Sequence, residues 1–508
     1  MAGGTFQSQN KVRAGAYINF ESVPKPMTTV GTRGTATIAI PLTWGENLIE
    51  LYSTDLVDGS SLAKVGLEVT DEDALILRKL LSHTYKAFIY RLDSNGAKAT
   101  ATVGTKKFEA KCAGTFGNKI EIVITQNLYA YVGSTIGTFY TGEQLALGTV
   151  IYKDENLEEV QGVVTEFTNS GNSTTIKVDN GAAETVTQGT ADSIVYTVQT
   201  IVNGVRKDSQ TVTKGSELVD NDFVVFDSTD ALQVTAGTPL AGGTDGTISD
   251  STYTAYLAAM GKHKFDTMGL PYATSKAVLD AAKLFVTQQC ENYGKKCKLV
   301  VCNSPSDSDY VINSINGYVT TDETVTPQIF VAELTGLDAG AGINESLTYK
   351  VVADAETAVE IINQVAEKDI EKALQTGKFI LTRRDDGAII IEKDINSLHT
   401  FTPKKNYAFS KNRVKRTLDE IANTGKLMWA KTYVGKVDNN ESGRAIYKAD
   451  MVNYLNTLQN TYNAIQNFDS ATDIQVVAGN DIDAVASKLY IQPVDSMEKL
   501  YLEVQVNG

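Results

Sequence analysis

The residues best able to do chemistry in this 508-residue chain are few and widely spaced. Only three histidines occur, His83, His263 and His399, and their spacing matches no metal-ligand or catalytic-triad pattern. The paired carboxyl groups of Asp385 and Asp386 lie in a turn-forming stretch and are expected to be solvated. The sequence therefore predicts no catalytic residue and no metal site, and we expect neither an enzyme nor a bound cofactor.

Cysteine is scarce as well. The spacing of Cys290, Cys297 and Cys302 fits neither paired zinc ligands nor the disulfide framework of a small domain, and Cys112 lies far from them. These four residues are interpreted as small buried hydrophobic side chains of a protein kept in a reducing compartment.

One glycine-rich stretch, GLDAGAG at 336–342, could in principle wrap a phosphate group. It matches neither the phosphate-loop nor the dinucleotide-binding pattern, and no strand-to-helix context supports such a role. The zincin and nucleophile-elbow motifs are also absent. Nucleotide chemistry is therefore not expected.

The overall composition, with 42% hydrophobic and 21% charged residues, is that of an ordinary globular protein of about three domains. No apolar run approaches the roughly 18–20 residues of a membrane helix, and the N-terminus lacks the apolar core of a signal peptide. A formal charge of −15 argues against general binding to nucleic acid or anionic membranes. We expect a protein that stays in the cytoplasm until cell lysis releases it.

Charge is unevenly distributed along the chain. Residues 97–250 hold 10 Lys/Arg against 19 Asp/Glu, whereas residues 378–450 hold 15 against 9. The basic segment contains a dense run, and two interpretations of it remain open: a solvated start of a helix, or a surface that holds a partner through charge. Its members are Lys404, Lys405, Lys411, Arg413, Lys415 and Arg416.

Both ends of the chain show the period-two alternation of half-buried strands. Such a terminal strand can join a sheet of its own subunit or extend a sheet of a neighbouring copy. The residues concerned are Ala16, Tyr17, Ile18 and Phe20 near the start, and Leu500, Leu502, Val504 and Val506 at the end.

The patterns between the ends predict a multidomain α+β fold. Residues 27–95 and 251–350 show α/β patterning and are interpreted as one split middle domain. Between them, residues 96–250 are rich in Thr, Val and Gly with frequent turn signals, which predicts an inserted all-β domain of sandwich or barrel type. Residues 1–26 and 497–508 are expected to be terminal arms.

Residues 351–496 are expected to form an α+β C-terminal domain. A helix is predicted over 355–375, a strand over 388–393 and a second helix over 411–422. Further on, apolar residues step at helical spacing, and this stripe is interpreted as core rather than partner surface: Met451, Leu455, Leu458, Tyr462 and Ile465.

Several segments outside the insert resemble the contractile tail sheath proteins of phages, prophage elements and R-type bacteriocins. They are the glycine turn LAGGTDG (240–246) with the segment up to Pro271, FVAELTGLDAGAGINESLTY (330–349), GAIIIEKDINSLHTFTP (387–403), KNRVKRTLDEIAN (411–423) and YVGKVDNN (433–440). Their order and spacing, rather than any single motif, carry the resemblance.

The resemblance implies a structural subunit that polymerises helically around a tail tube and contracts to drive the tube through a target cell envelope. It implies a homo-oligomer of stacked rings, with the tail tube protein, the baseplate and the tail terminator as partners, and no direct contact with nucleic acid or membrane. The terminal strands would then link subunits, and the basic run would face the tube. An extracellular adhesin or surface-array protein is the alternative, suggested by the Thr/Gly-rich acidic β domain.

Overall fold

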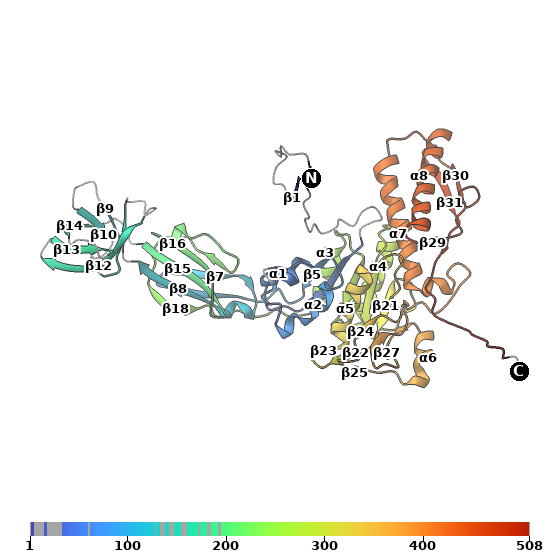
Figure 1. Ribbon diagram of the computed structural model, residues 1–508, viewed down its shortest axis with the longest axis horizontal. Coiled ribbons are helices and arrows are strands. Elements are labelled where there is room, and N and C mark those ends of the chain that lie inside the picture. The colour runs from blue at the N-terminus through green and yellow to red at the C-terminus, as the bar shows by residue number, and fades with distance from the viewer. Residues whose placement is uncertain are drawn as a thin grey trace.

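The structure is a computed structural model. It describes residues 33–506, apart from 59–60, 128, 133–137, 142–146, 154–159, 171–172, 180–183 and 191–194, together with the short strands β1 (Ala2–Gly4) and β2 (Gly15–Tyr17). The described chain is elongated, with a β barrel at one end, a β sandwich next to it, and an α/β body with the C-terminal helices at the other end (Figure 1). The fold is therefore mixed α+β, as the sequence predicted.

A seven-stranded sheet forms the centre of the α/β body. Neighbouring strands run parallel except at one edge, where β4 is antiparallel to β5. The pairing of β3 with β19 joins the chain segments on the two sides of the β insert. In sheet order the strands are β26 (Lys378–Phe379), β21 (Val311–Ser314), β20 (Lys298–Cys302), β19 (Thr267–Leu270), β3 (Thr35–Ile40), β5 (Lys86–Arg91) and β4 (Leu48–Tyr52).

Helices cover both faces of this sheet, so its central strands are buried on both sides. On one face, α3 (Asp250–Met260) and α4 (Lys276–Glu291) pack on side chains such as Phe88 and Leu299. On the other, α2 (Leu75–Leu81) and α5 (Pro327–Gly340) pack on Ile38 and Ile89. A short helix, α1 (Asp55–Asp58), follows β4.

The glycine-rich stretch at 336–342 serves this packing. A Cβ atom on Gly336 would lie 2.4 Å from the carbonyl oxygen of Leu80, and one on Gly340 would lie 1.8 Å from that of His83. Both distances are far below van der Waals contact, so only glycine lets α5 cross the end of α2 this closely. Helix packing, and not phosphate binding, explains these glycines.

The insert consists of two β modules, one nested within the other, where the sequence predicted one domain. The inner module is a sandwich of a four-stranded and a three-stranded sheet. The outer module is a closed barrel whose strands all fall between β8 and β15 of the sandwich. The sandwich strands are β6 (Lys98–Val103), β7 (Lys106–Ala113), β8 (Ile120–Asn127), β15 (Val195–Val202), β16 (Val205–Val212), β17 (Val224–Phe226) and β18 (Thr235–Pro239). The barrel strands are β9 (Tyr129–Val132), β10 (Thr138–Thr141), β11 (Val150–Tyr152), β12 (Val160–Ser170), β13 (Ser173–Val178) and β14 (Glu184–Thr190).

Residues 351–397, which the sequence assigned to the C-terminal domain, pack with the body. The predicted helix over 355–375 is mostly wrong, because 358–362 pairs with β22 as a strand and only 370–375 is α-helical. The strand predicted over 388–393 is confirmed as β28. The elements of this region are β22 (Gly317–Thr320), β23 (Thr324–Val325), β24 (Val351–Ala353), β25 (Ala358–Ile362), α6 (Ile370–Gln375), β27 (Leu381–Arg383) and β28 (Ile389–Ile391).

The C-terminal region is built on two long helices, α7 (Asn412–Met428) and α8 (Glu441–Asn460), joined through a π-helical turn at Trp429–Tyr433. The predicted stripe is core where it lies on α8, since Met451, Leu455 and Leu458 are all buried. It is wrong beyond that point, because α8 ends at Asn460, so Tyr462 lies past the helix and Ile465 lies in a short strand. Short strands complete the region: β29 (Ile465–Gln466), β30 (Ile474–Ala478), β31 (Val485–Leu489) and β32 (Gln492–Pro493). None of the described helices has the length and apolar character needed to cross a membrane.

Candidate assembly surface

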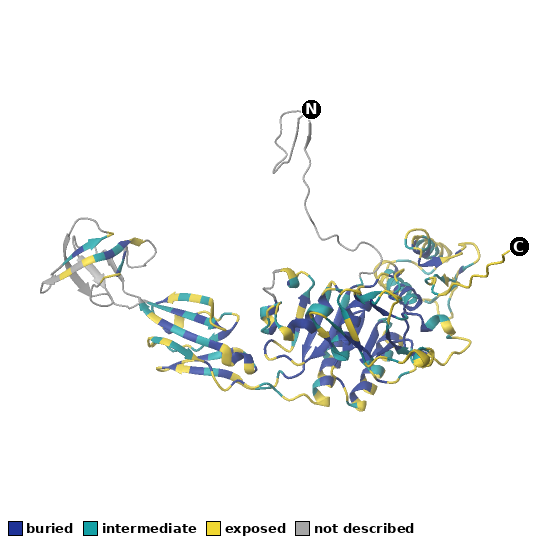
Figure 2. Ribbon diagram, turned by 60° about the horizontal axis from the view of Figure 1, so that its bottom comes forward, coloured by how far each residue is buried: buried dark blue, intermediate teal, exposed yellow. Residues whose placement is uncertain are grey.

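The C-terminal tail, residues 499–506, runs away from the body and belongs to no strand (Figure 1). The predicted strand over 500–506 is therefore not formed within this subunit. Its four apolar side chains are largely exposed (Figure 2), at 85% for Leu500, 75% for Leu502, 71% for Val504 and 87% for Val506. An alternating segment forms a strand only where a partner edge supplies its hydrogen bonds, and among the described residues no strand pairs with the tail.

The tail starts from a fixed point, the tail root at residues 495–498. The half-buried carboxylate of Glu498 accepts hydrogen bonds from Lys411 and, at 2.8 Å, from Thr348. Lys411 also lies 3.5 Å from Asp495. Burial raises the pKa of Glu498, but the hydrogen bond and charge of Lys411 outweigh it and the net shift is downward. The root is thus held in the ionised, paired state while the tail beyond it is free.

The N-terminal candidates are only partly described. Ala16 and Tyr17 lie in β2, which pairs in parallel with β1 through Gly3 and Gly4. Ile18 and Phe20 lie outside the described residues. Linkage of subunits through this end stays a prediction.

The basic run divides into inward and outward members. Lys404 is exposed, Arg413 is half-buried, and Lys405 bonds to Asp309 at 2.7 Å. In contrast Lys411, Lys415 and Arg416 are buried, with 2%, 4% and 0% exposure. The prediction that these three face a tube is wrong for this structure, because their charges are already paired with carboxylates of the same chain.

Lys415 illustrates the internal pairing. Its ammonium bonds to Asp419 at 2.5 Å, one helical turn ahead, and lies 3.7 Å from Asp309 of the body. It also lies 4.5 Å from the centre of the Tyr310 ring. Burial lowers the pKa of Lys415, but the two carboxylates outweigh burial and leave it raised. Lys415 therefore stays charged inside the protein.

A second set, the buried ion network of Lys298, Asp338, Asp394 and Arg416, joins α7 to the body. The Arg416 guanidinium donates to Asp338 on α5 and to Asp394, each at 2.6 Å. Lys298 on β20 donates to Asp338 at 2.9 Å. These four side chains come from four separate chain segments, so no spacing in the sequence indicates the network.

The carboxylates of this network have further polar partners, whereas the buried Nε of Arg416 has no hydrogen-bond partner among the described residues. Asp338 also accepts from Thr267 at 2.8 Å, and Asp394 accepts from Asn412 at 2.9 Å. Burial raises the pKa of Asp338, but Lys298 and Arg416 outweigh it and hold the pKa well below its usual range. Burial, together with the nearby charge of Arg416, outweighs the attraction of Asp338 and lowers the pKa of Lys298 to about 8. Paired buried charges of this kind lock one packing arrangement.

The histidines each have local partners rather than a shared site. His83 lies 3.7 Å from Glu333, His263 packs on the Phe88 ring, and His399 bonds to the Ser397 carbonyl at 2.9 Å. Among the described residues no group of three or more His, Cys, Asp or Glu is arranged to hold a metal ion.

One further feature of this region is a candidate for assembly. Strands β30 and β31 form a two-stranded hairpin on α8, with Ala478 paired to Val485 at its turn end. Within the described chain no third strand covers either edge. Each edge therefore presents unpaired backbone N–H and C=O groups. The sequence indicated the first strand, around Ile474–Val477, but it placed the second at Leu489–Ile491, whereas β31 spans Val485–Leu489. It gave no sign that the edges stay open.

A split α/β body, a nested β insert and a free apolar tail define a multidomain assembly subunit. Residues 246–397 match the model of the phage tail sheath protein central domain, and residues 404–507 match that of the phage tail sheath C-terminal domain. The XkdK protein of the phage-like element PBSX of Bacillus subtilis is 30% identical, with 100% of both chains covered. This chain belongs to the phage tail sheath family.

Solved structures agree. The sheath tail protein of Desulfitobacterium hafniense is 33% identical with a TM-score of 0.71, covering 96% of this chain and 99% of that one. The sheath tail protein of Listeria innocua is 29% identical with a TM-score of 0.69, covering 92% and 94%. As a tail sheath protein the chain is a structural part of a particle tail and not an enzyme. The two family matches meet between 397 and 404, where the chain leaves the body, rather than at 351.

Proposed function

We propose that this protein polymerises helically around a tail tube and contracts to drive the tube through a target cell envelope. The observation that carries the proposal is the exposed apolar tail of a chain that belongs to the sheath family. A head-to-tail contact of this kind does not close on itself, and repetition of such a contact builds an open helical polymer. Assembly in the cytoplasm, release by lysis and association with a baseplate and a tail terminator belong to the same proposal.

The tail links subunits by adding a strand to another copy. Its apolar residues alternate, so they share one face of an extended strand. Left exposed, this face costs hydrophobic free energy that burial against another chain recovers. A strand pairs in a register that a one-residue slip would disrupt, so the link is specific.

The open edge of the β30–β31 hairpin is the acceptor we favour. A two-stranded hairpin is marginally stable alone, and a third strand stabilises it. As a third strand, the tail would pair with the open backbone groups of the hairpin edge and would add its apolar face to the sheet. Because the tail root is fixed by Lys411 and Glu498, movement of one subunit is transmitted to the next through a short connection.

Contact with the tube falls to the outward members of the basic run. Lys404 and Arg413 keep exposed surface, and exposed charge pairs are weak and screened by salt, which suits a contact that must release during sliding. Reversing Lys404 to Glu is expected to weaken cosedimentation with tubes in low salt. Unchanged cosedimentation would remove this part of the proposal.

The test of the strand link is deletion of residues 499–508, which keeps the tail root in place. The free energy of unfolding of the subunit should stay within about 0.5 kcal/mol, because residues 499–506 are exposed and, in the described part of the chain, pair with no strand. Electron microscopy should then show no tubes or rings. Tubes that still form would overturn the proposal, and so would unfolding of the truncated subunit.

A pair of full-length variants separates strand pairing from simple tethering. Leu502→Asn with Val504→Asn removes the apolar face and is expected to abolish polymerisation. The matched control changes the opposite face, with Tyr501→Asn and Gln505→Asn, and should polymerise. Equal behaviour of the two variants would show that alternation does not matter and that the tail is not a pairing strand.

A further inference from the structure

Two buried thiols meet where α4 ends and β20 begins. Cys290 and Cys297 are 1% and 3% exposed, and their sulfur atoms lie 4.0 Å apart. The Cys290 thiol donates to the Cys297 carbonyl at 3.2 Å, and the Cys297 N–H donates to the Cys290 sulfur at 3.3 Å. From the sequence, the two cysteines were interpreted as separate buried side chains, whereas in the structure their thiols are in contact.

The pair is chemically unequal. The hydrogen bond from the Cys297 thiol, together with its backbone N–H, lowers the pKa of Cys290 despite burial. The same contact and burial raise the pKa of Cys297 well above its usual value. Cys290 is thus the better thiolate, and Cys297 keeps its proton. A lowered pKa favours the thiolate, which is the nucleophilic form of cysteine.

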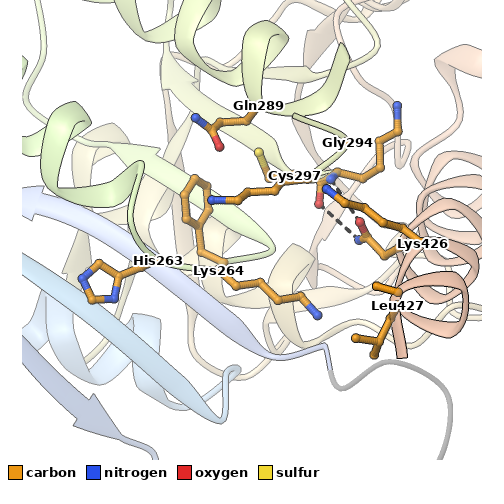
Figure 3. A pocket seen from close by; sticks show the side chains of 12 residues that line it. His263, Lys264, Gln289, Gly294, Cys297, Lys426 and Leu427 are labelled. Carbon is orange, nitrogen blue, oxygen red and sulfur yellow. Dashed lines mark hydrogen bonds between the residues drawn. The ribbon is translucent and has the colours of Figure 1, made fainter. Parts of the chain in front are cut away.

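Small reagents have a route to this pair. A cavity of about 230 Å³ lies between the body and α7, and Cys297 lines it. In Figure 3, Gln289 and Cys297 lie on one side of the cavity, and Lys426 and Leu427 of α7 lie on the other. Lys264 also lines it. Cys290 is not part of the cavity lining, but its sulfur lies 4.0 Å from that of Cys297, which is.

We propose that Cys290 and Cys297 form a redox site that a small peroxide converts to an intramolecular disulfide. The Cys290 thiolate attacks a peroxide oxygen, the O–O bond breaks, and with one proton water leaves and a sulfenic acid remains. Cys297 then attacks the Cys290 sulfur, and its proton leaves with the hydroxyl group as a second water. Two thiols lose two electrons, and one hydrogen peroxide is reduced to two waters.

The disulfide would act on the joint between the body and α7. The loop between the two cysteines binds α7 through Lys296, whose N–H donates to the Asn423 side chain at 3.1 Å, and through Tyr293, whose carbonyl accepts from Lys426. Closing the ring restricts this loop in the unfolded chain. We expect the oxidised subunit to melt about 2 °C or more above the reduced one.

Peptide mapping of the full-length protein tests the site. The subunit is treated with hydrogen peroxide near stoichiometric amounts, alkylated under denaturing conditions and analysed by mass spectrometry. We expect a cross-link between Cys290 and Cys297 with loss of two hydrogens. Cys112 and Cys302 are matched controls: they are more exposed, but burial without a thiol partner raises their pKa, so they should stay alkylatable.

The opposite ranking would overturn the proposal: Cys112 or Cys302 oxidised first, with Cys290 and Cys297 still fully alkylated. Cys290→Ser and Cys297→Ser variants add a second check. Each should leave its remaining thiol no faster to oxidise than Cys302. A single-thiol variant that oxidises as fast as the wild type would show that the pair does not act together. The wild-type map alone decides if a variant does not fold.

Discussion

Helix α7 and the C-terminal tail belong to the same region of the chain, but they differ in which side chains they bury. On α7, Lys415 and Arg416 are buried although they carry charge. In the tail, Leu500 and Leu502 are exposed although they are apolar. Each arrangement would be unfavourable without a partner.

The difference lies in where the partner is found. The α7 charges meet Asp309, Asp338 and Asp394 of the same chain, so their pairing fixes the subunit internally. Among the described residues the tail pairs with no strand of its own subunit, so we propose that its partner is another subunit. On this proposal, the buried charge pairs connect parts of one subunit, and the exposed alternating apolar residues join that subunit to the next.

The largest expected effect comes from breaking the internal side of this comparison. Arg416→Met leaves Asp394 and Asp338 buried with fewer opposite charges. Removing one partner of a buried ion pair typically costs about 3–5 kcal/mol of unfolding free energy. Urea denaturation measures it. The matched control is Arg384→Gln, which removes an exposed pair with Asp386 and should cost less than about 1 kcal/mol. Similar losses for both variants would mean that the network does not lock α7.

A smaller loss of unfolding free energy is expected at the tail root, where a buried cation contacts the start of the exposed tail. Lys411→Met removes the main cation beside Glu498 and leaves a half-buried carboxylate with weaker partners. We expect a loss of about 2 kcal/mol and faster hydrogen exchange at 495–498. Lys404→Met, at an exposed position of the same run, should change stability by less than about 0.5 kcal/mol. Equal exchange in the two variants would show that the root is held by other contacts.

Low pH should weaken the contact between Lys411 and Glu498, but less than the Lys411→Met substitution does. Glu498 has a folded-state pKa below its ordinary value of 4.5, so its pairing stabilises the folded state above that pH. As pH falls below 4.5, the unfolded state takes up the proton first, and the stabilisation is lost as pH passes through the folded-state pKa. Hydrogen exchange at 495–498 should therefore rise below pH 4.5. In Glu498→Gln this rise should be absent, and its persistence would assign the effect to another group.

Local patterns in the sequence predicted local structure well. The part of the α8 stripe from Met451 to Leu458, the strand at 389–391 and the start of α7 follow from periodicity and are confirmed. Residues 358–362 were predicted helical because their apolar spacing fits a helix, but pairing with β22 outweighs that preference.

The ion network could not be predicted. The basic run shows that charged residues are present, but it does not show whether their side chains point into the protein or into solvent. Lys298 and Asp338 lie far from Arg416 in the chain, and only the packed body brings them together. The tail was the opposite case: its alternation indicated a strand, yet only the fold shows that no partner for it lies in the subunit.

The smallest effect is expected from removing the outer barrel. Val195 pairs directly with Asn127 in the sandwich, so a turn of about four Gly/Ser residues can replace 128–194 and leave β8 and β15 as a hairpin. The sandwich itself must stay, because its core holds Trp44, which packs on Phe116 with ring centres 5.0 Å apart. Removing the sandwich would expose that side chain.

The shortened subunit should keep the unfolding free energy of the body within about 0.5 kcal/mol and still form tubes, because neither the ion network nor the tail involves the barrel. Electron microscopy and urea denaturation check the two expectations. A folded but monomeric variant would show that the barrel takes part in assembly, and the division between an internally paired body and an externally paired tail would then need a third contact.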